Sequence, residues 1–203
     1  MRIFVDMDNV MVDYYSGLAA TRADLSWIER ETDPLEYGDE CRRTFGGREH
    51  DLLEHLYKLP HQFWAYLQVM PGLAKLLDAV VKFDPDWRVL TRGVESEAAW
   101  SGKYAWMKRY FPKEQGRLII MGYVQSHTAW SGKELIAGPG AILIDDSPNN
   151  CLKWDAAGGN AFHWKGFRAI DPDLETNLNE QTDRLRRWLR RIDVENKEAA
   201  AGR

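Results

Sequence analysis

Five short apolar segments, spaced along 203 residues, are the feature that most limits how this chain can fold. The segments are Ile3–Val5, Trp87–Leu90, Leu118–Met121, Ala141–Ile144 and Ala161–His163. Short apolar runs of this kind are typical of strands buried on both faces. Stretches with helical periodicity lie between most of them. Strands that alternate with helices predict an α/β fold, with a Rossmann-like three-layer core around a parallel sheet.

Two of the intervening stretches have the spacing of amphipathic helices. The first begins after Pro71-Gly72, and the second follows the second apolar segment. Residues that share one face of the first are Leu73, Leu76, Leu77, Val80 and Val81, and those that share one face of the second are Trp100, Tyr104, Met107 and Phe111.

Residues 14–70 break this alternation, because they separate the first two strands by far more than a usual connection. We expect a small helical cap, inserted after the first strand, that covers the site. The catalytic core would then consist of residues 1–13 and 71–172, and residues 173–203 would form a C-terminal helix with a frayed tail. Five arginines of that helix form a basic stripe, which is either a solvated face or a contact for nucleic acid or a partner: Arg184, Arg186, Arg187, Arg190 and Arg191.

Composition excludes several classes of protein. The net charge of −4 argues against a protein whose main task is to grip a nucleic-acid backbone. The two cysteines, Cys41 and Cys151, are 110 positions apart and form no zinc motif. Because no apolar run approaches membrane-spanning length and no signal peptide precedes the first strand, we expect a cytoplasmic protein without a membrane partner. A homodimer stays open.

Acidic residues follow two of the predicted strands. Asp6 and Asp8 come directly after the first strand, and Asp145-Asp146 ends the fourth. In a parallel sheet both pairs would meet at the carboxyl edge, where ligands bind. Carboxylates this close require a cation or a proton between them, and oxygen ligands of this type suit Mg²⁺.

A hydroxyl and a cation follow the second strand, in Leu90-Thr91-Arg92-Gly93. A strand-end hydroxyl and the backbone N–H groups of the next loop can bind phosphate oxygens. Taken alone, Thr91 is also an ordinary residue to find after a strand.

Taken together, these residues resemble the haloacid dehalogenase superfamily of phosphotransferases, and more closely the 5'(3')-deoxyribonucleotidases. The segments that carry the resemblance are Asp6-Met7-Asp8 with Val10 and Asp13, Phe63-Trp64, Met70-Pro71-Gly72, Lys103–Phe111 and Leu143–Asp146. The chain departs from the family pattern at Asn9, where the family usually has Gly, and at Arg92, where it usually has Ser.

The resemblance implies a Mg²⁺-dependent phosphatase that hydrolyses (deoxy)ribonucleoside monophosphates. Asp6 would be the nucleophile and Asp8 the general acid and base. Asp6, Asp8, Asp145 and Asp146 would form the metal site, with Asp8 contributing its backbone carbonyl. Residues expected to bind phosphate are Thr91, Arg92, Lys133 and Lys103, and those expected to contact the nucleoside are Phe63, Trp64, Tyr14 and Phe45.

Two alternatives stay open. The same chemistry could act on another small phosphoester or on a nucleic-acid 3'-phosphate. A non-catalytic phosphate-binding protein with the same fold is the other alternative, although the joint presence of Asp6, Asp8, Thr91, a lysine and Asp146 disfavours it.

Overall fold

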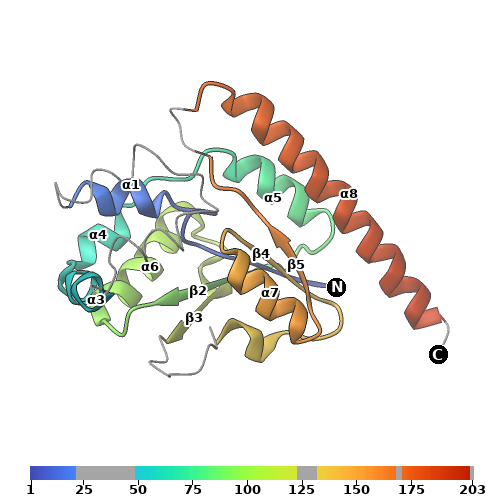
Figure 1. Ribbon diagram of the computed structural model, residues 1–203, viewed down its shortest axis with the longest axis horizontal. Helices are drawn as coiled ribbons and strands as arrows, with labels where there is room; N and C mark the ends of the chain where they lie inside the picture. Colours follow the sequence, from blue (N-terminus) through green and yellow to red (C-terminus); the bar gives the residue numbers. More distant parts are fainter. Residues whose placement is uncertain (22–48, 123–131, 168–170, 202–203) are drawn as a thin grey trace.

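A five-stranded parallel sheet forms the centre of the molecule (Figure 1). The computed structural model describes residues 1–21, 49–122, 132–167 and 171–201. The strands are β1 (Arg2–Val5), β2 (Arg88–Gly93), β3 (Leu118–Gly122), β4 (Ala141–Asp145) and β5 (Asn160–His163). Their spatial order is β3-β2-β1-β4-β5, and each neighbouring pair is parallel. All five predicted strands are therefore present, and the chain order reverses beside β1, where such sheets bind ligands.

Helices cover both faces of this sheet (Figure 1). Core clusters place α5 (Leu73–Val81), α6 (Glu97–Tyr110) and α8 (Leu174–Ala201) on one face. The other face carries α7 (Pro148–Ala156) and is flanked by the short helix η3 (Lys133–Ile136), which contacts α7. A further short helix, η2 (Gln115–Arg117), precedes β3. This arrangement confirms the predicted three-layer α/β architecture.

Alternating side chains of the strands supply the two cores. In β1, Ile3 and Val5 point into the cluster built by α5, α6 and α8, whereas Phe4 points into the cluster built by α7. Phe4 meets Trp154 of α7 edge to face, with ring centroids 5.6 Å apart. Both sides of the central strands are packed, which explains why β1 and β4 are apolar over most of their length.

The buried face of α6 differs from the predicted one. Trp100 and Tyr104 are 43% and 48% exposed, so that part of the prediction is wrong. The residues buried on this helix are Ala99, Gly102, Lys103, Trp106 and Met107. The buried face therefore differs from the predicted one by a rotation about the axis of α6, and this rotation has two causes. Lys103 is buried because its charge finds partners at the site, and Gly102 allows α4 to cross closely. A Cβ atom at Gly102 would lie 2.4 Å from Cβ of Trp64.

In α5 the prediction holds for most of the face. Leu73, Leu76 and Val80 are buried, whereas Val81 is 46% exposed at the end of the helix.

A helical insert follows β1, as predicted. Its described parts are α1 (Tyr14–Ala19), α3 (Glu49–Lys58) and α4 (His61–Ala65). The Asp13 side chain begins α1 by accepting a hydrogen bond from the backbone N–H of Ser16 at 3.2 Å. The side chains that join the insert to the loop after β2 and to α6 are Leu18, Leu56, Leu59, Trp64, Val94 and Ala99. One wall of the site therefore comes from the insert and the other from the sheet. Phe45, predicted to contact the nucleoside, lies outside the described residues.

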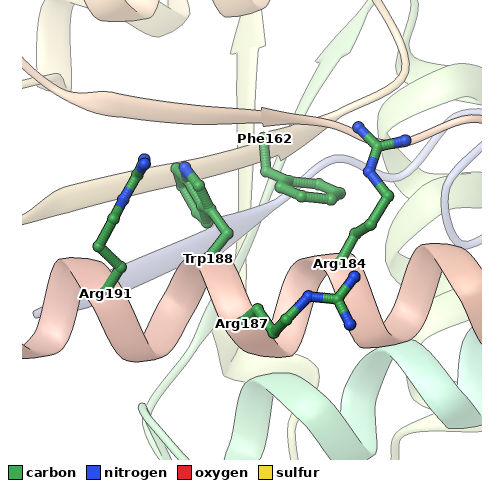
Figure 2. A pocket seen from close by; sticks show the side chains of 5 residues that line it. All are labelled: Phe162, Arg184, Arg187, Trp188 and Arg191. Carbon is green, nitrogen blue, oxygen red and sulfur yellow. The ribbon is translucent and has the colours of Figure 1, made fainter.

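The long helix α8 packs beside α5 and continues to Ala201. It therefore includes Glu198–Ala201, which were expected to belong to the frayed tail. Its buried apolar side chains are Leu178, Leu185, Leu189 and Ile192. Trp188 extends sideways to Phe162 of β5, with ring centroids 5.4 Å apart (Figure 2). Among the described residues, no helix is both long and apolar enough to cross a membrane.

Candidate active site

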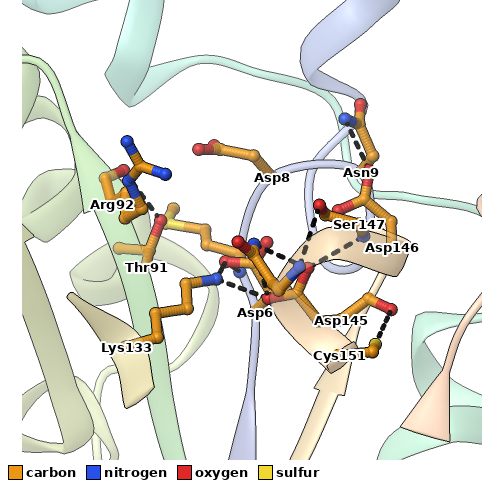
Figure 3. Close-up of polar contacts among 12 residues, drawn as sticks. Asp6, Asp8, Asn9, Thr91, Arg92, Lys133, Asp145, Asp146, Ser147 and Cys151 are labelled. Carbon is orange, nitrogen blue, oxygen red and sulfur yellow. Dashed lines mark hydrogen bonds and ion pairs between the residues drawn. The ribbon is translucent and has the colours of Figure 1, made fainter. Parts of the chain in front are cut away.

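The predicted acidic residues meet at the carboxyl edge of the sheet (Figure 3). Asp6 directly follows β1, Asp145 ends the neighbouring strand β4, and Asp146 directly follows it. The backbone N–H of Asp6 donates to the carbonyl of Ile144 at 2.8 Å, so the pairing of β1 with β4 extends to the site. Thr91 lies within β2, opposite Ile120, rather than after the strand as predicted. Its hydroxyl still reaches the same edge, because β2 is the other neighbour of β1.

Asp6, Asp145 and Asp146 form a cluster that could hold a cation. One carboxylate oxygen from each lies within 4.8 Å of the other two, and all three residues are buried. These are hard oxygen donors of the kind that Mg²⁺ binds. Three of the four predicted acidic side chains therefore converge, whereas the Asp8 carboxylate lies against Lys103.

The electrostatics of this cluster also fit a cation. Burial, together with the nearby charges of Asp145 and Asp8, raises the pKa of Asp6 to about 7 despite the opposing effect of Lys133. Burial and the charges of Asp145 and Asp6 likewise raise the pKa of Asp146 well above its usual range. Without a cation, the protein relieves this repulsion by holding protons. A divalent ion would take their place.

Lys133 sits between two members of the cluster. Gly132, with φ of +87°, turns the chain into η3 so that this lysine enters the core. Lys133 Nζ donates to Asp145 Oδ2 at 2.6 Å and pairs with Asp6 Oδ1 at 2.7 Å. Burial alone would lower the pKa of Lys133, but the charges of Asp145 and Asp6 outweigh burial and raise it. This ammonium therefore stays charged and holds the nucleophile candidate in position.

Lys103 occupies a second position, on the side of the site nearer the insert. Its Nζ donates to Asp8 Oδ2 at 2.5 Å, to the Thr91 hydroxyl at 2.8 Å and to the Arg92 carbonyl at 3.0 Å. Both lysines predicted from the sequence thus lie at the site, each beside a different aspartate. The other oxygen of Asp8, Oδ1, has no hydrogen-bond partner in the described structure. Arg92 is half-buried and lies next to Thr91 at the edge of the cluster (Figure 3).

The charges of the site are unbalanced. Four carboxylates, from Asp6, Asp8, Asp145 and Asp146, meet two ammonium groups, from Lys103 and Lys133. With Arg92 at the edge of the cluster, acidic groups still outnumber basic ones, and an excess of carboxylates favours a bound cation.

Neighbouring groups fix the orientation of Asp145 and Asp146 at the end of β4. The Asp145 carboxylate accepts hydrogen bonds from the backbone N–H of Ser147 at 2.9 Å and from Asn150 Nδ2 at 3.0 Å. His163 Nε2 lies 2.9 Å from the Asp146 carbonyl, where it can donate. Supporting contacts of this type orient metal ligands.

Asn9 is a site residue that the sequence reasoning did not identify as functional. Its φ of +55° is the left-handed conformation, which Asn tolerates better than most residues. Its Nδ2 donates to Asp146 Oδ2 at 3.1 Å, and its Oδ1 accepts from the backbone N–H of Tyr15 at 3.2 Å. The one feature of the sequence that could have identified Asn9 is that the resembling family usually has Gly at this position. A left-handed turn accepts either residue, but only Asn has a side chain that reaches Asp146.

Three aromatic residues of the insert form a wall beside Lys103. Trp64 is 2% exposed, and its ring stacks on Tyr14 with centroids 6.0 Å apart. Phe63 meets Trp64 edge to face at 4.9 Å, and Lys103 Nζ lies 5.7 Å from the centroid of the Trp64 ring. The buried Trp64 Nε1 has no hydrogen-bond partner in the described part of the chain. Tyr14 and Phe63 are half-buried, so they are the members of this wall that keep exposed surface.

No protein-family model matches this sequence, and no curated protein matches it. Solved structures do match. A phosphonoacetaldehyde hydrolase-like protein from Oleispira antarctica is 14% identical; the match covers 100% of this chain and 94% of that one, with a TM-score of 0.55.

Two further structures match with TM-scores of 0.42 and 0.40. The first is CbbY from Rhodobacter sphaeroides in complex with phosphate, 16% identical over 84% of this chain and 89% of its own. The second is a HAD family enzyme from Bacteroides thetaiotaomicron in a magnesium complex, 14% identical over 84% of this chain and 96% of its own. Identities this low concern the fold alone. With the strand order and the helical insert after β1, the likeness to the Oleispira protein shows that the chain has a fold of the haloacid dehalogenase type.

Proposed function

We propose that this protein is a Mg²⁺-dependent phosphatase that hydrolyses nucleoside monophosphates, with deoxyribonucleotides as the expected substrates. One observation carries the proposal: two aspartates at the end of β1 face different partners. Asp6 lies among acidic residues and Lys133, whereas Asp8 lies against Lys103 and Thr91. Such different surroundings allow the two carboxyl groups to take different roles, Asp6 as the nucleophile beside a bound cation and Asp8 as the group that exchanges a proton with the ester oxygen.

Asp6, Asp145 and Asp146, with the backbone carbonyl of Asp8, would hold the cation. A bound Mg²⁺ would neutralise both the attacking carboxylate and the phosphoryl oxygens, which otherwise repel each other. It would also displace the protons that the raised pKa values of Asp6 and Asp146 favour, so that Asp6 is ionised and able to attack.

The reaction has two steps. In the first, a carboxylate oxygen of Asp6 bonds to phosphorus while the bond to the ester oxygen breaks, and Asp8 donates its proton to the departing alcohol. In the second, Asp8 takes a proton from water, the water oxygen bonds to phosphorus, and the bond to Asp6 breaks to release phosphate. Both aspartates return to their starting state.

Positive and hydroxyl groups on the β2 side would bind the other phosphoryl oxygens. Lys103 Nζ and the Thr91 hydroxyl lie 2.8 Å apart, so one phosphate could contact both. The side chain of Arg92, next to them in β2, adds a third positive charge at the edge. These donors would stabilise the charge that develops on the transferring group.

The aromatic wall supports a nucleoside as the leaving group. Tyr14 and Phe63 offer ring surface beside Lys103, and stacking on a nucleobase contributes on the order of 1–3 kcal/mol per ring. The buried Trp64 Nε1 has no partner among the described residues, so an acceptor on a base or a sugar that reached it would satisfy this donor. These features, with the resemblance of the sequence to 5'(3')-deoxyribonucleotidases, favour a nucleotide over other small phosphoesters.

A panel of phosphoesters tests the proposal. Phosphate release would be measured from deoxyribonucleoside 5'- and 3'-monophosphates, ribonucleotides and an aryl phosphate, with Mg²⁺ and with EDTA. We expect Mg²⁺-dependent turnover, kcat/KM at least about tenfold higher for a nucleotide than for the aryl phosphate, and loss of nearly all turnover in Asp6→Asn with the fold retained. Wild-type turnover in Asp6→Asn would refute the assigned nucleophile, and turnover of the aryl phosphate alone would refute the nucleotide assignment.

A further inference from the structure

A cluster of basic and aromatic side chains lies away from the acidic cluster, between α8 and the edge strand β5. A pocket of about 340 Å³ opens there, lined by Phe162, Arg184, Arg187, Trp188 and Arg191 (Figure 2). This volume falls in the range of small-molecule sites. Three positive charges and two aromatic rings form this pocket, and the proposed phosphatase reaction uses none of them.

The helix periodicity brings these groups together. Arg184, Arg187, Trp188 and Arg191 follow one another at intervals of three, one and three residues, so they share one face of α8. The adjacent face carries Leu185, Leu189 and Ile192, which are buried in the core. The basic face is therefore held in place by a packed helix, and the first and last arginines are about 10 Å apart along its axis.

The arginines of this face have few acidic partners. Arg191 Nε lies 3.6 Å from Glu195 in an exposed pair, which contributes little. The guanidinium of Arg184 lies 6.0 Å from the centroid of the Phe162 ring. By contrast Arg186, on another side of the helix, pairs with Asp78 at 2.9 Å and with Asp183. Of the five arginines of the stripe, Arg186 is thus neutralised by ion pairs, three line the pocket, and Arg190 is exposed outside it.

Aromatic surface determines which anion fits. Trp188 is half-buried, and Figure 2 shows its indole beside the Phe162 ring, with Arg191 on one side and Arg184 on the other. A flat base could stack on the indole while guanidinium groups on both sides bind oxygens. Three guanidinium groups spread over about 10 Å along the helix match several linked phosphates better than a single one.

We propose that this pocket binds a nucleoside polyphosphate, with the base against Trp188 and the phosphates on Arg184, Arg187 and Arg191. The ligand differs from the proposed substrate of the acidic site, which carries one phosphate. The proposal does not depend on the phosphatase assignment, because the pocket shares no residue with that site.

Calorimetric titration of the full chain with a nucleoside triphosphate, in EDTA, tests the proposal. Arg187→Gln and Arg191→Gln should each weaken binding by about tenfold or more, since each removes a charged contact to phosphate. Arg190→Gln is the matched control, because it removes the same charge from the same helix at an exposed position outside the pocket. Its affinity should stay within about twofold of wild type.

Two further arms test the ligand class. Trp188→Leu should weaken binding of the nucleoside triphosphate by about fivefold or more but leave the affinity for inorganic triphosphate unchanged. A single-stranded oligonucleotide without terminal phosphates should bind more weakly than the free nucleotide. The proposal is overturned by equal loss in Arg190→Gln, by nucleotide binding that survives both pocket arginine variants, by inorganic triphosphate that binds as well as the nucleotide, or by tighter binding of the oligonucleotide.

Discussion

Lys133 Nζ lies 2.7 Å from Asp6 Oδ1, and the same ammonium donates to Asp145 Oδ2 at 2.6 Å. One buried positive charge thus separates two of the three carboxylates that form the candidate metal site, but it reaches neither oxygen of Asp146 by a hydrogen bond in the described structure. Burial, together with the repulsion that remains among the carboxylates, raises the pKa values of Asp146 and Asp6. The site is therefore least stable when it is most fully ionised.

The first prediction concerns pH. Asp6 has a pKa of about 7 in the folded protein and an ordinary pKa near 3.8 when unfolded, so the folded state binds more protons between these values. Stability of the metal-free protein should consequently fall as pH rises from about 4 to about 7, by a few kcal/mol when Asp146 acts in the same direction. Urea unfolding in EDTA at pH 5 and pH 8 measures this change.

Mg²⁺ should restore the stability that the metal-free protein loses as pH rises. Added at pH 8, it should raise the unfolding midpoint more than at pH 5, where protons compete for the same oxygens. Asp146→Asn is the control variant, and it should show both a shallower pH dependence and a smaller response to Mg²⁺. A metal-free protein that is equally stable at pH 5 and pH 8 would contradict the assignment of strain to this cluster.

The second prediction distinguishes the role of Lys133, which we expect to be mainly in stability, from that of Lys103, which we expect to be mainly in turnover. Lys133→Met removes a buried charge from two carboxylates and should lower the free energy of unfolding by about 3–5 kcal/mol. Lys82→Met is the control, because Lys82 is an exposed lysine paired with Asp78 one turn away, and its loss should cost less than about 0.5 kcal/mol. Urea unfolding compares them, and equal effects would mean that the Lys133 pairs contribute nothing.

Lys103→Met should act mainly on turnover. Its ammonium contacts Asp8 and Thr91, the groups proposed to donate the proton and bind phosphate. We expect kcat to fall by about 10²-fold or more, as when one charged donor to a transition state is removed. Single-turnover phosphate release would measure it, and an unchanged kcat would remove Lys103 from the proposed machinery.

The acidic cluster could be predicted from the sequence because strand ends are simple to place. Asp6 follows an apolar run, Asp146 follows another, and parallel strands bring their carboxyl ends to one edge whatever the intervening chain does. Topology alone therefore suffices for residues that directly follow strands.

Lys103 and Asn9 show where such reasoning fails. A lysine in a helix is ordinarily assigned to the solvent-exposed face. Lys103 is nevertheless fully buried, because the Asp8 carboxylate, 95 positions away, accepts its hydrogen bond and balances its charge. Because Lys103 is on the buried face of α6, Trp100 and Tyr104 lie on its exposed face. Asn9 depends on its own left-handed backbone and on an oxygen 137 positions away, and no local pattern reports either.

The third prediction uses the backbone of Asn9 to separate two effects. Asn9→Gly keeps the left-handed turn but loses the hydrogen bond to Asp146, whereas Asn9→Ala loses both. Both variants should weaken Mg²⁺ binding by about tenfold or more, as the loss of a ligand's supporting contact does. Only Asn9→Ala should cost an additional 1 kcal/mol or so of stability. Thermal unfolding at a series of Mg²⁺ concentrations reports both quantities, and Mg²⁺ affinity unchanged in Asn9→Gly would refute the role of its amide.

The last prediction concerns the crossing of α4 and α6, which holds the aromatic wall against the site. A Cβ at Gly102 would lie 2.4 Å from Cβ of Trp64 and 2.8 Å from the carbonyl oxygen of His61, so Gly102→Ala must push α4 outward. Overpacking of this kind costs about 1–3 kcal/mol and outweighs the gain of up to about 1 kcal/mol that Ala brings to a helix.

Gly116→Ala is the matched control, since nothing lies within 4 Å of its Cβ position. It should be neutral or slightly stabilising. Because Trp64 and Tyr14 would shift while Asp6 and Lys133 stay in place, Gly102→Ala should raise KM for a nucleoside monophosphate and leave KM for an aryl phosphate nearly unchanged. Equal increases in both KM values would indicate that α4 supports the phosphate site itself, and the aromatic wall would then lose its assignment as the nucleoside pocket.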